Sequence, residues 1–324
     1  MTAADSDGAD RQTALRLGTR GSELALWQAR HVAERLAALP GAPRVEVVVL
    51  RTRGDLLSDV PLTETGGTGF FTAEIERALL EDEVDLAVHS LKDLATSIPA
   101  GLALAAVLSR DDPRDALVVR EGIAAGLDEL PRGARIGTSS LRRQALVRRW
   151  RSDLEVADLR GNVPTRIRRL DEGRFDAIVL AAAGLARLGL EGRIATRLPV
   201  DRFPPAVGQG ALAVQVRESD AVARPLVEAL DDPRARAATT AERALLHRLG
   251  GGCQLPLGAL ATVRDGALEL VATVCSRDGG RAIAGHSAGS AREAAAIGER
   301  LADELLALGA RELLAGFRAA TDPA

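Results

Sequence analysis

The sequence predicts an α/β protein with two similar lobes, followed by a smaller α+β module. The first two thirds of the 324 residues alternates short apolar strands with amphipathic helices. A strand, a Gly-Thr turn and a helix occur twice, around Gly18 and Gly137. From about residue 232 the order changes to a helix, strands and a closing helix. The length suffices for two or three domains, each with its own core.

The first lobe begins with a predicted strand at residues 15–18. Ser22 is the expected N-cap of a helix whose apolar residues recur with helical spacing. The apolar run at residues 45–50 predicts a buried strand. Residues 70–81 are expected to be helical, and residues 86–88 return to a strand. This alternation favours a mostly parallel sheet.

The second lobe is expected to repeat the first. Arg135-Ile-Gly-Thr-Ser-Ser140 resembles Arg16-Leu-Gly-Thr-Arg-Gly-Ser22, and Asp176-Ala-Ile-Val179 resembles Asp85-Leu-Ala-Val88. Convergent turn chemistry is the alternative explanation of such short matches. In open α/β sheets, ligands bind beyond the carboxyl ends of the strands, which is where both Gly-Thr turns fall.

Two segments are expected to connect the lobes. Asp111-Asp-Pro-Arg114 reads as a linker, and Pro204-Pro205 with Val207-Gly-Gln-Gly210 reads as the return crossing before a strand at 211–216. The predicted domains are residues 13–110 with 209–230, residues 115–204, and residues 233–324.

The third module is predicted from a change of pattern. A helix at 239–249 precedes strands at 257–263 and 268–275, with the turn Asp265-Gly266 between the strands. A long helix at 291–308 closes the chain. Strands followed by a helix suggest a small α+β domain.

The composition disfavours several classes of protein. A net charge of −3 gives no global reason to expect nucleic acid, and no apolar run is long enough for a bilayer. The polar residues 1–12 read as a frayed tail, not a signal peptide. Two cysteines and four scattered histidines form neither a disulfide framework nor a metal cluster. A cytoplasmic enzyme or binding protein is therefore the default expectation.

The positive charges are distributed unusually. Of 42 basic residues only one, Lys92, is a lysine, which codon bias could also explain. Several arginines lie at turns and helix starts, where free amides and guanidinium groups favour anions. These are Arg20, Arg142, Arg143, Arg160 and Arg166. Other arginines, at 148, 149, 151, 168 and 169, are expected on solvated faces. The predicted ligand carries several carboxylates or phosphates, and no nucleotide fingerprint is present.

Two further residues carry chemistry. Asp93 follows a predicted buried strand and faces arginines, so it stays ionised and could stabilise a cation or accept a substrate N–H. A salt bridge that tethers a loop is the alternative.

Cys253 lies in Gly250-Gly-Gly-Cys-Gln-Leu-Pro256, where glycines leave the thiol unshielded, so reactivity or covalent attachment is expected. Cys275, in an apolar strand, suits packing. A cysteine hydrolase with His89 or His247 as base stays open.

A set of short motifs runs in order along the chain: Gly18-Thr-Arg-Gly-Ser22, Leu24-Ala-Leu-Trp-Gln28, Thr52-Arg-Gly-Asp55, Val88-His-Ser-Leu-Lys-Asp93, Gly137-Thr-Ser-Ser-Leu-Arg-Arg-Gln144, Leu159-Arg-Gly-Asn162, Ala206-Val-Gly-Gln-Gly210 and Gly251-Gly-Cys-Gln254. Each motif alone is weak, but the ordered set is highly specific. Together these segments resemble the hydroxymethylbilane synthase family, also called the porphobilinogen deaminases.

The resemblance implies two lobes like those of type 2 periplasmic binding proteins, with the active site between them. It also implies a third domain that has a three-stranded antiparallel sheet and carries the cofactor cysteine. By this resemblance Cys253 holds a dipyrromethane cofactor through a thioether, and Asp93 is the catalytic carboxylate. The implied reaction condenses four porphobilinogen molecules, with loss of ammonia through a cationic azafulvenium, into linear hydroxymethylbilane.

The resemblance also implies the binding residues. For the cofactor they are Lys92, Asp93, Thr138, Ser139, Ser140, Arg142, Arg143 and Arg160. For the substrate they are Arg20, Ser22, Arg160, Arg166, Arg187 and Gln209.

The chain departs from the family pattern at Glu64 and Thr68, where a glycine-rich loop often has lysines, and at Ala95 and Pro164. The expected protein is a cytoplasmic monomer with porphobilinogen as substrate and no metal, nucleic acid or membrane partner. A non-catalytic, two-lobed anion-binding protein is the alternative, although it assigns no role to Cys253.

Overall fold

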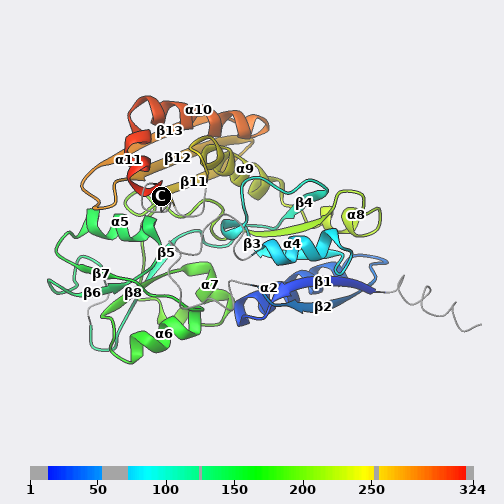
Figure 1. The fold of residues 1–324 in the computed structure, drawn as a ribbon, viewed down its shortest axis with the longest axis horizontal. Helices are drawn as coiled ribbons and strands as arrows, with labels where there is room; N and C mark the ends of the chain where they lie inside the picture. The colour runs from blue at the N-terminus through cyan, green and yellow to red at the C-terminus, as the bar shows by residue number, and fades with distance from the viewer. Residues whose placement is uncertain (1–13, 53–71, 124–125, 252–254, 319–324) are drawn as a thin grey trace, which may run out of the picture.

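The computed structural model describes residues 14–52, 72–123, 126–251 and 255–318. The described chain forms two five-stranded sheets and one three-stranded sheet, each with its own helices (Figure 1). Two α/β lobes and a small α+β module with a three-stranded antiparallel sheet confirm the predicted fold class. No helix in the described ranges is long and apolar enough to span a bilayer.

The first sheet has the strand order β2-β1-β3-β10-β4. Its strands are β1 (Ala14–Arg20), β2 (Arg44–Leu50), β3 (Leu86–Ser90), β4 (Leu102–Val107) and β10 (Leu212–Arg217). Its helices are α2 (Glu23–Ala37) and α8 (Ala223–Glu228) on one face and α4 (Ala73–Leu80) on the other. The prediction of a mostly parallel sheet is confirmed, because β1, β2, β3 and β4 run in one direction. The fifth described strand of this sheet, β10, returns from the other lobe and runs antiparallel to its neighbours β3 and β4.

The prediction that residues 45–50 form a buried strand was wrong. The run forms β2, but β2 is an edge strand that pairs with β1 alone among the described strands. Val47 and Val49 are 38% and 52% exposed. An apolar run therefore identified the strand correctly but not its position, because an edge strand lacks the second neighbour that would cover it.

The second sheet repeats the topology of the first, with the order β7-β6-β8-β5-β9. Its strands are β5 (Asp115–Val119), β6 (Arg135–Gly137), β7 (Glu155–Ala157), β8 (Ala177–Ala181) and β9 (Thr196–Arg197). Helix α5 (Leu141–Trp150) covers one face, while α6 (Val163–Asp171) and α7 (Ala182–Arg187) cover the other. In both sheets the second strand in the order, β1 or β6, is flanked by two parallel neighbours. The fourth strand in the order, β10 or β5, is antiparallel to both of its neighbours.

Equivalent contacts explain the repeated motifs. The Asp85 carboxylate accepts a hydrogen bond from the Arg16 backbone N–H at 2.8 Å, and that of Asp176 accepts one from the Arg135 N–H at 2.9 Å. Each aspartate N–H also donates to the carbonyl of the same arginine. The two lobes are therefore similar in contacts as well as in sequence, which confirms the predicted repeat.

The turns and caps of the two lobes also match the sequence. Ser22 Oγ accepts from Ala25 N–H at 3.3 Å as the predicted N-cap of α2, and Ser140 caps α5 through Arg143 N–H. Gly137 is required by close packing, because a Cβ there would lie 2.9 Å from both Leu159 Cδ2 and Phe175 Cδ1.

The third module has the order β11-β12-β13, from β11 (Leu257–Arg264), β12 (Ala267–Cys275) and β13 (Ala282–Ser290). Helices α9 (Pro233–Arg248) and α10 (Ala294–Ala307) share its core. Asp265 and Gly266 both have positive φ, as the predicted hairpin turn requires. The prediction of one closing helix was incomplete: Gly309, with φ +97°, ends α10, and α11 (Ala310–Arg318) follows.

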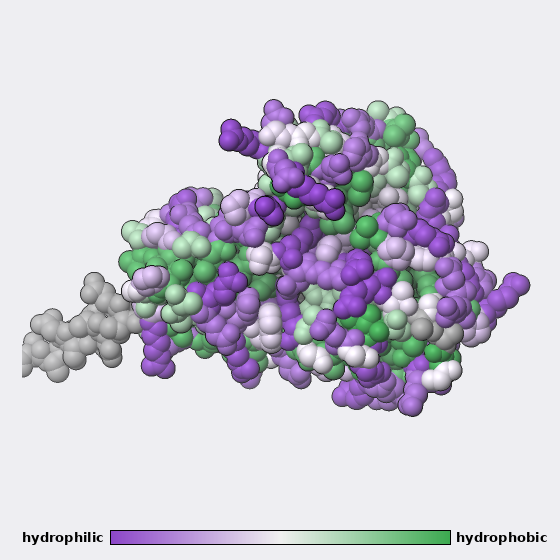
Figure 2. All heavy atoms as spheres, turned by 180° about the vertical axis from the view of Figure 1, so that it is seen from behind, coloured by the Kyte–Doolittle hydropathy of each residue, from purple (hydrophilic) through white to green (hydrophobic). Residues whose placement is uncertain are grey.

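The third module contacts both lobes. Cys275 is 1% exposed and packs in the core of the second lobe, which agrees with its predicted packing role. The Arg243 guanidinium donates to the carbonyls of Leu94 and Ala95 in the first lobe. From behind, hydrophilic side chains gather in the middle of the molecule, below this module (Figure 2).

A single carboxylate joins both passages between the lobes to the third module. Glu242 of α9 is fully buried and accepts hydrogen bonds from Arg110 Nη1 at 2.5 Å and Nη2 at 3.1 Å. It also accepts from the Gly208 N–H at 2.7 Å and from the Ala261 N–H at 2.8 Å. Arg110 follows β4, Gly208 lies on the return to β10, and Ala261 lies in β11. Both passages between the sheets are therefore held against the third module.

Candidate active site

The predicted catalytic carboxylate lies at the carboxyl end of β3. Asp93 ends a single 3-10 turn (Leu91–Asp93) that directly follows the strand, and its side chain is exposed. It lines a cavity of about 80 Å³ together with Arg20 and Ser22 of the β1–α2 turn. The structure thus brings together three of the predicted site residues at the point where parallel strands end.

Two further polar residues line this cavity: Gln28, to which no role was assigned from the sequence, and His89, which was considered only as a hydrolase base. Gln28, 3% exposed, lies one turn of α2 beyond Leu24 and donates from Nε2 to Ser90 Oγ at 2.8 Å. His89 is 5% exposed, and burial lowers its pKa to about 4, with Arg20 acting in the same direction and Gln215 opposing. A histidine that stays neutral in this way is a poor base, which weighs against the cysteine hydrolase.

A fully buried carboxylate holds the two arginines that begin α5. Asp115 Oδ2 lies 2.7 Å from Arg142 Nη1, and Asp115 Oδ1 accepts from Arg143 Nη2 at 2.7 Å and Nε at 2.9 Å. Despite burial, these guanidinium groups hold the pKa of Asp115 far below its usual range. Arg142 and Arg143 are only 4% and 6% exposed, so neither points into bulk solvent.

Gln209 connects this carboxylate to the lysine. Its Nε2 donates to Asp115 Oδ1 at 3.1 Å and to the Pro113 carbonyl at 2.8 Å, while its Oε1 accepts from Lys92 Nζ at 3.4 Å. Burial lowers the pKa of Lys92 to about 8; Asp93 and Asp115 oppose this shift, whereas Arg143 and Arg142 add to it. Four residues predicted separately (Lys92, Arg142, Arg143, Gln209) therefore form one network.

Further cations extend the network from α6. Arg166 donates from Nε to the Gly161 carbonyl at 2.7 Å. Its pKa is lowered to about 10 by burial and by the charges of Arg143, Arg160 and Arg169, with Asp93 opposing. Positive charge is thus concentrated around one exposed carboxylate, that of Asp93.

Two arginines that were expected on solvated faces are partly buried and bind backbone carbonyls. Arg169 was expected on a solvated face but donates to the Arg160 carbonyl at 3.1 Å. Arg151 is likewise only partly exposed, because its guanidinium donates to the carbonyls of Leu127 and Leu130. Helix position alone could not reveal either partner.

The turn after β6 supplies hydroxyl groups. Thr138 Oγ1 accepts from the Ser140 N–H at 3.3 Å, and Ser140 is occupied as the α5 cap. Ser139 Oγ is buried and makes no hydrogen bond within the described ranges. Among the three residues predicted to supply hydroxyl groups, Ser139 is therefore the one whose hydroxyl group has no hydrogen-bond partner in the described chain.

Arg187 lies at the crossing between the lobes. Its Nε donates to Asp111 Oδ2 at 2.9 Å and its Nη2 to the Gly210 carbonyl at 2.8 Å. Its guanidinium also lies 5.8 Å from the centre of the Trp27 ring of α2. Arg187 thus connects α7 of the second lobe to both crossing segments and to the first lobe.

The predicted cofactor cysteine, Cys253, lies outside the described residues, as do Glu64 and Thr68. The described residues before it lie close to the loop after Asp93: a Cβ on Gly251 would be 3.0 Å from Thr96 Oγ1. Thr96 Oγ1 also lies 3.4 Å from His247 Nδ1. Gly251 therefore lies beside the loop that follows the predicted catalytic carboxylate.

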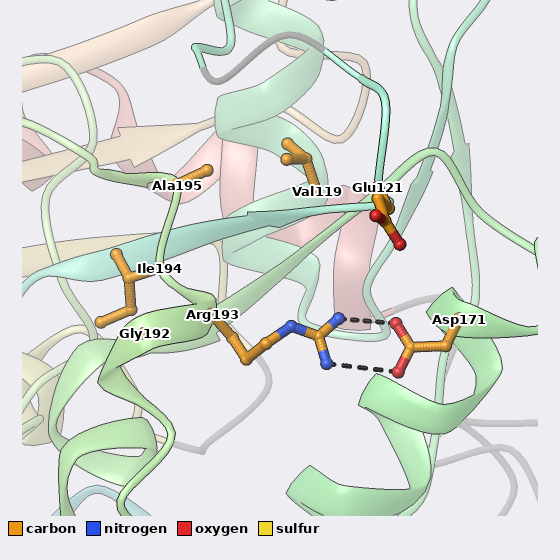
Figure 3. Close-up of a pocket in the computed structure, with 7 residues that line it drawn as sticks. All are labelled: Val119, Glu121, Asp171, Gly192, Arg193, Ile194 and Ala195. Atoms are coloured by element: carbon orange, nitrogen blue, oxygen red, sulfur yellow. Dashed lines mark hydrogen bonds and ion pairs between the residues drawn. The ribbon is translucent and has the colours of Figure 1, made fainter.

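A larger pocket of about 470 Å³ lies elsewhere in the second lobe. It is lined by Glu121, Asp171 and Arg193, and Arg193 makes a two-pronged ion pair with Asp171 at 2.6 and 3.2 Å (Figure 3). The charges of Arg193 and Asp171 already neutralise each other, and none of the predicted site residues lines this pocket. This pocket is therefore not the candidate site.

Comparison with known families gives matches over most of the chain. Residues 15–224 match "Porphobilinogen deaminase, dipyromethane cofactor binding domain", and residues 237–307 match "Porphobilinogen deaminase, C-terminal domain". The porphobilinogen deaminase of Syntrophobacter fumaroxidans is 49% identical over 300 residues, covering 93% of this chain and 96% of the relative. That of Pelobacter propionicus is 48% identical with the same coverage of both chains.

Solved structures give weaker likenesses. The methionine binding protein MetQ is 14% identical with a TM-score of 0.43, covering 67% of this chain and 89% of that one. The periplasmic VFT2 domain of Bordetella pertussis BvgS is 14% identical with a TM-score of 0.40, covering 70% of this chain and 90% of that one. These scores are too low to support an argument about ligands.

Proposed function

The chain belongs to the porphobilinogen deaminase family, and from this premise we propose which residues carry out the family's reaction. The reaction is that of a transferase, hydroxymethylbilane synthase. It condenses four porphobilinogen molecules head to tail, with loss of ammonia, and water then releases the linear tetrapyrrole. The observation that carries our assignment is the concentration of Lys92, Arg143 and Arg166 around the exposed Asp93.

The residues at the site fit the dipyrromethane cofactor. Burial is the main cause of the lowered pKa values of Lys92 and Arg166, and neighbouring guanidinium groups add to both shifts. Added carboxylates would oppose these shifts, so the site favours a polycarboxylate. The buried Ser139 Oγ offers a further hydrogen bond. We assign the cofactor's carboxylates to Lys92, Ser139, Arg142, Arg143 and Arg160, with Thr138 and Ser140 shaping the turn. When bound, the cofactor supplies the pyrrole carbon that accepts each new substrate unit.

Asp93 is assigned the catalytic role. Porphobilinogen becomes cationic as ammonia leaves, and an ionised carboxylate close to the pyrrole N–H stabilises that charge. Asp93 follows a strand whose end is fixed by the sheet, and its loop is held by Arg243 through two carbonyls. The carboxylate is therefore placed by rigid elements although its side chain is exposed.

The remaining residues are assigned to the substrate. Arg20, Ser22, Arg160 and Arg166 are proposed to hold its acetate and propionate groups, because guanidinium binds carboxylates bidentately. The contacts of Arg187 and Gln209 with the crossing segments support a role in holding the lobes around the growing chain.

We propose three domains with the boundaries predicted from the sequence: residues 13–110 with 209–230, residues 115–204, and residues 233–324. The division of strands among three sheets supports this assignment. We also propose that the protein works as a cytoplasmic monomer.

The intact mass of the purified protein tests the proposed function. We expect a mass above that of the sequence by one dipyrromethane, and no such increment in Cys253→Ser. The matched control is Cys275→Ser, which should keep the increment because Cys275, at the end of β12, is buried against the core of the second lobe. An active protein with an unmodified mass would refute the assignment of Cys253.

A second test uses the single lysine. In protein labelled with ¹³C-lysine, one side-chain resonance reports Lys92. In Cys253→Ser this resonance should titrate near pH 8, because burial lowers the pKa of Lys92 to about 8. In the loaded wild type the pKa should be higher, since nearby carboxylates favour the charged ammonium. Equal values in the two proteins would remove Lys92 from the cofactor site.

A further inference from the structure

We propose that Asp115 is a positioning residue for this reaction. Its buried carboxylate holds Arg142 and Arg143 directly, and Lys92 through Gln209, in the arrangement that receives the carboxylates of cofactor and substrate. The proposal deepens the function proposed above and rests on it.

The contacts of Asp115 leave little freedom to the two guanidinium groups. Each of its oxygens lies 2.7 Å from a different arginine. Arg142 Nη1 also donates to the Pro204 carbonyl at 2.7 Å, and Arg143 Nη1 donates to the Val179 carbonyl at 3.0 Å. Each guanidinium is therefore held from two directions by buried acceptors, and its plane is set before a ligand arrives.

Asp115 cannot itself touch a ligand, because its side chain is 0% exposed. Its effect must therefore pass through its partners. It contacts Arg142 and Arg143 directly and reaches Lys92 through Gln209, and all three of these residues are cations. Three cations so close together repel one another, and an uncompensated buried charge is strongly unfavourable. One interior carboxylate reduces that repulsion and still leaves net positive charge for the ligand.

The position of Asp115 also connects the site to the lobe crossings. Asp115 begins β5, directly after the outgoing segment, and Gln209 lies on the return segment. Gln209 binds both Asp115 and the Pro113 carbonyl. The start of α5 and both crossing segments thus meet at one carboxylate, so the arginines keep their place relative to Lys92 of the first lobe.

The test compares Asp115→Asn with Glu242→Gln. Both neutralise a fully buried carboxylate at the crossings, but the partners of Glu242 include no proposed ligand residue. Both variants should lower the melting temperature. Asp115→Asn alone should raise KM for porphobilinogen at least about tenfold, which corresponds to about 1.4 kcal/mol of binding free energy. Its kcat should fall by a smaller factor. It should also reduce the fraction of chains that carry the cofactor mass, whereas Glu242→Gln should keep KM within about twofold of wild type.

The Lys92 resonance gives a readout that does not depend on activity. Asp115 raises the pKa of Lys92, so Asp115→Asn should lower it, and Asp115→Glu should restore it in part because the charge returns. If Asp115→Asn fails to fold, Gln209→Leu replaces it in this measurement. This change removes the hydrogen-bond acceptor of the Lys92 ammonium, so it should also lower the pKa of Lys92.

A KM and a Lys92 pKa no different from those of Glu242→Gln would overturn the proposal and leave Asp115 a purely structural residue. A wild-type protein without the cofactor mass would instead refute the proposed function, and the Lys92 shift would still be measurable.

Discussion

Replacing Asp93 by asparagine is expected to lower kcat by roughly 10²–10³-fold, the usual effect of removing one preorganised electrostatic group. Asparagine keeps the size of the side chain but removes the charge that opposes the developing cation. The KM for porphobilinogen should stay the same or fall, because the cations Lys92 and Arg166 lose a competing anion. Steady-state kinetics separates the two constants, and the intact mass should still show the cofactor.

The matched control for Asp93 is Asp303→Asn. Asp303 is also an exposed carboxylate, paired with Arg248 at 2.8 Å, but it lies in the third module away from the cavity. This change should leave both kinetic constants unaltered, because exposed ion pairs contribute little. If Asp93→Asn raised KM and left kcat intact, Asp93 would be a binding group and not the catalytic carboxylate.

Replacing Glu242 by alanine is expected to destabilise the protein by about 3–5 kcal/mol, the usual cost of breaking a buried ion pair. The change leaves Arg110 without its carboxylate and the N–H groups of Gly208 and Ala261 without their acceptor. At about 2 °C per kcal/mol for a chain of this size, the melting temperature should fall by roughly 6–10 °C. Scanning calorimetry measures this directly.

Glu228→Ala provides the comparison for stability. Glu228 pairs with Arg224 at 2.7 Å on α8, but its side chain is 48% exposed. Its loss should change stability by no more than about 0.5 kcal/mol, because water replaces the lost partner. A loss below about 1 kcal/mol for Glu242→Ala would mean that the three parts are held together mainly by apolar packing.

Local sequence patterns were sufficient for most elements of the fold. The Gly-Thr turns, the cap Ser22 and the turn Asp265-Gly266 depend on neighbours within a few residues, so the sequence predicts them directly. The ordered motifs likewise identified the family that the comparisons show. The repeated aspartate before a strand pointed to two similar lobes, and equivalent backbone contacts account for it.

Long-range partners were beyond the reach of the sequence. The run at 45–50 looked buried because periodicity reports apolar faces and not the number of neighbouring strands. Asp115 could have been noticed as a charged residue that opens an apolar strand, but nothing local indicates its pairing with Arg142 and Arg143. The same holds for Glu242, whose partners lie 132, 34 and 19 residues away along the chain.

The sequence by itself therefore determined the kind of site: many guanidinium groups, one ammonium and a carboxylate at strand ends. Only the tertiary structure decided which of those cations are held by interior carboxylates and which surround Asp93. The physical reason is that residue type sets the charge a side chain can carry. Burial and the partners brought from distant segments set how strongly that charge is held and which way it faces.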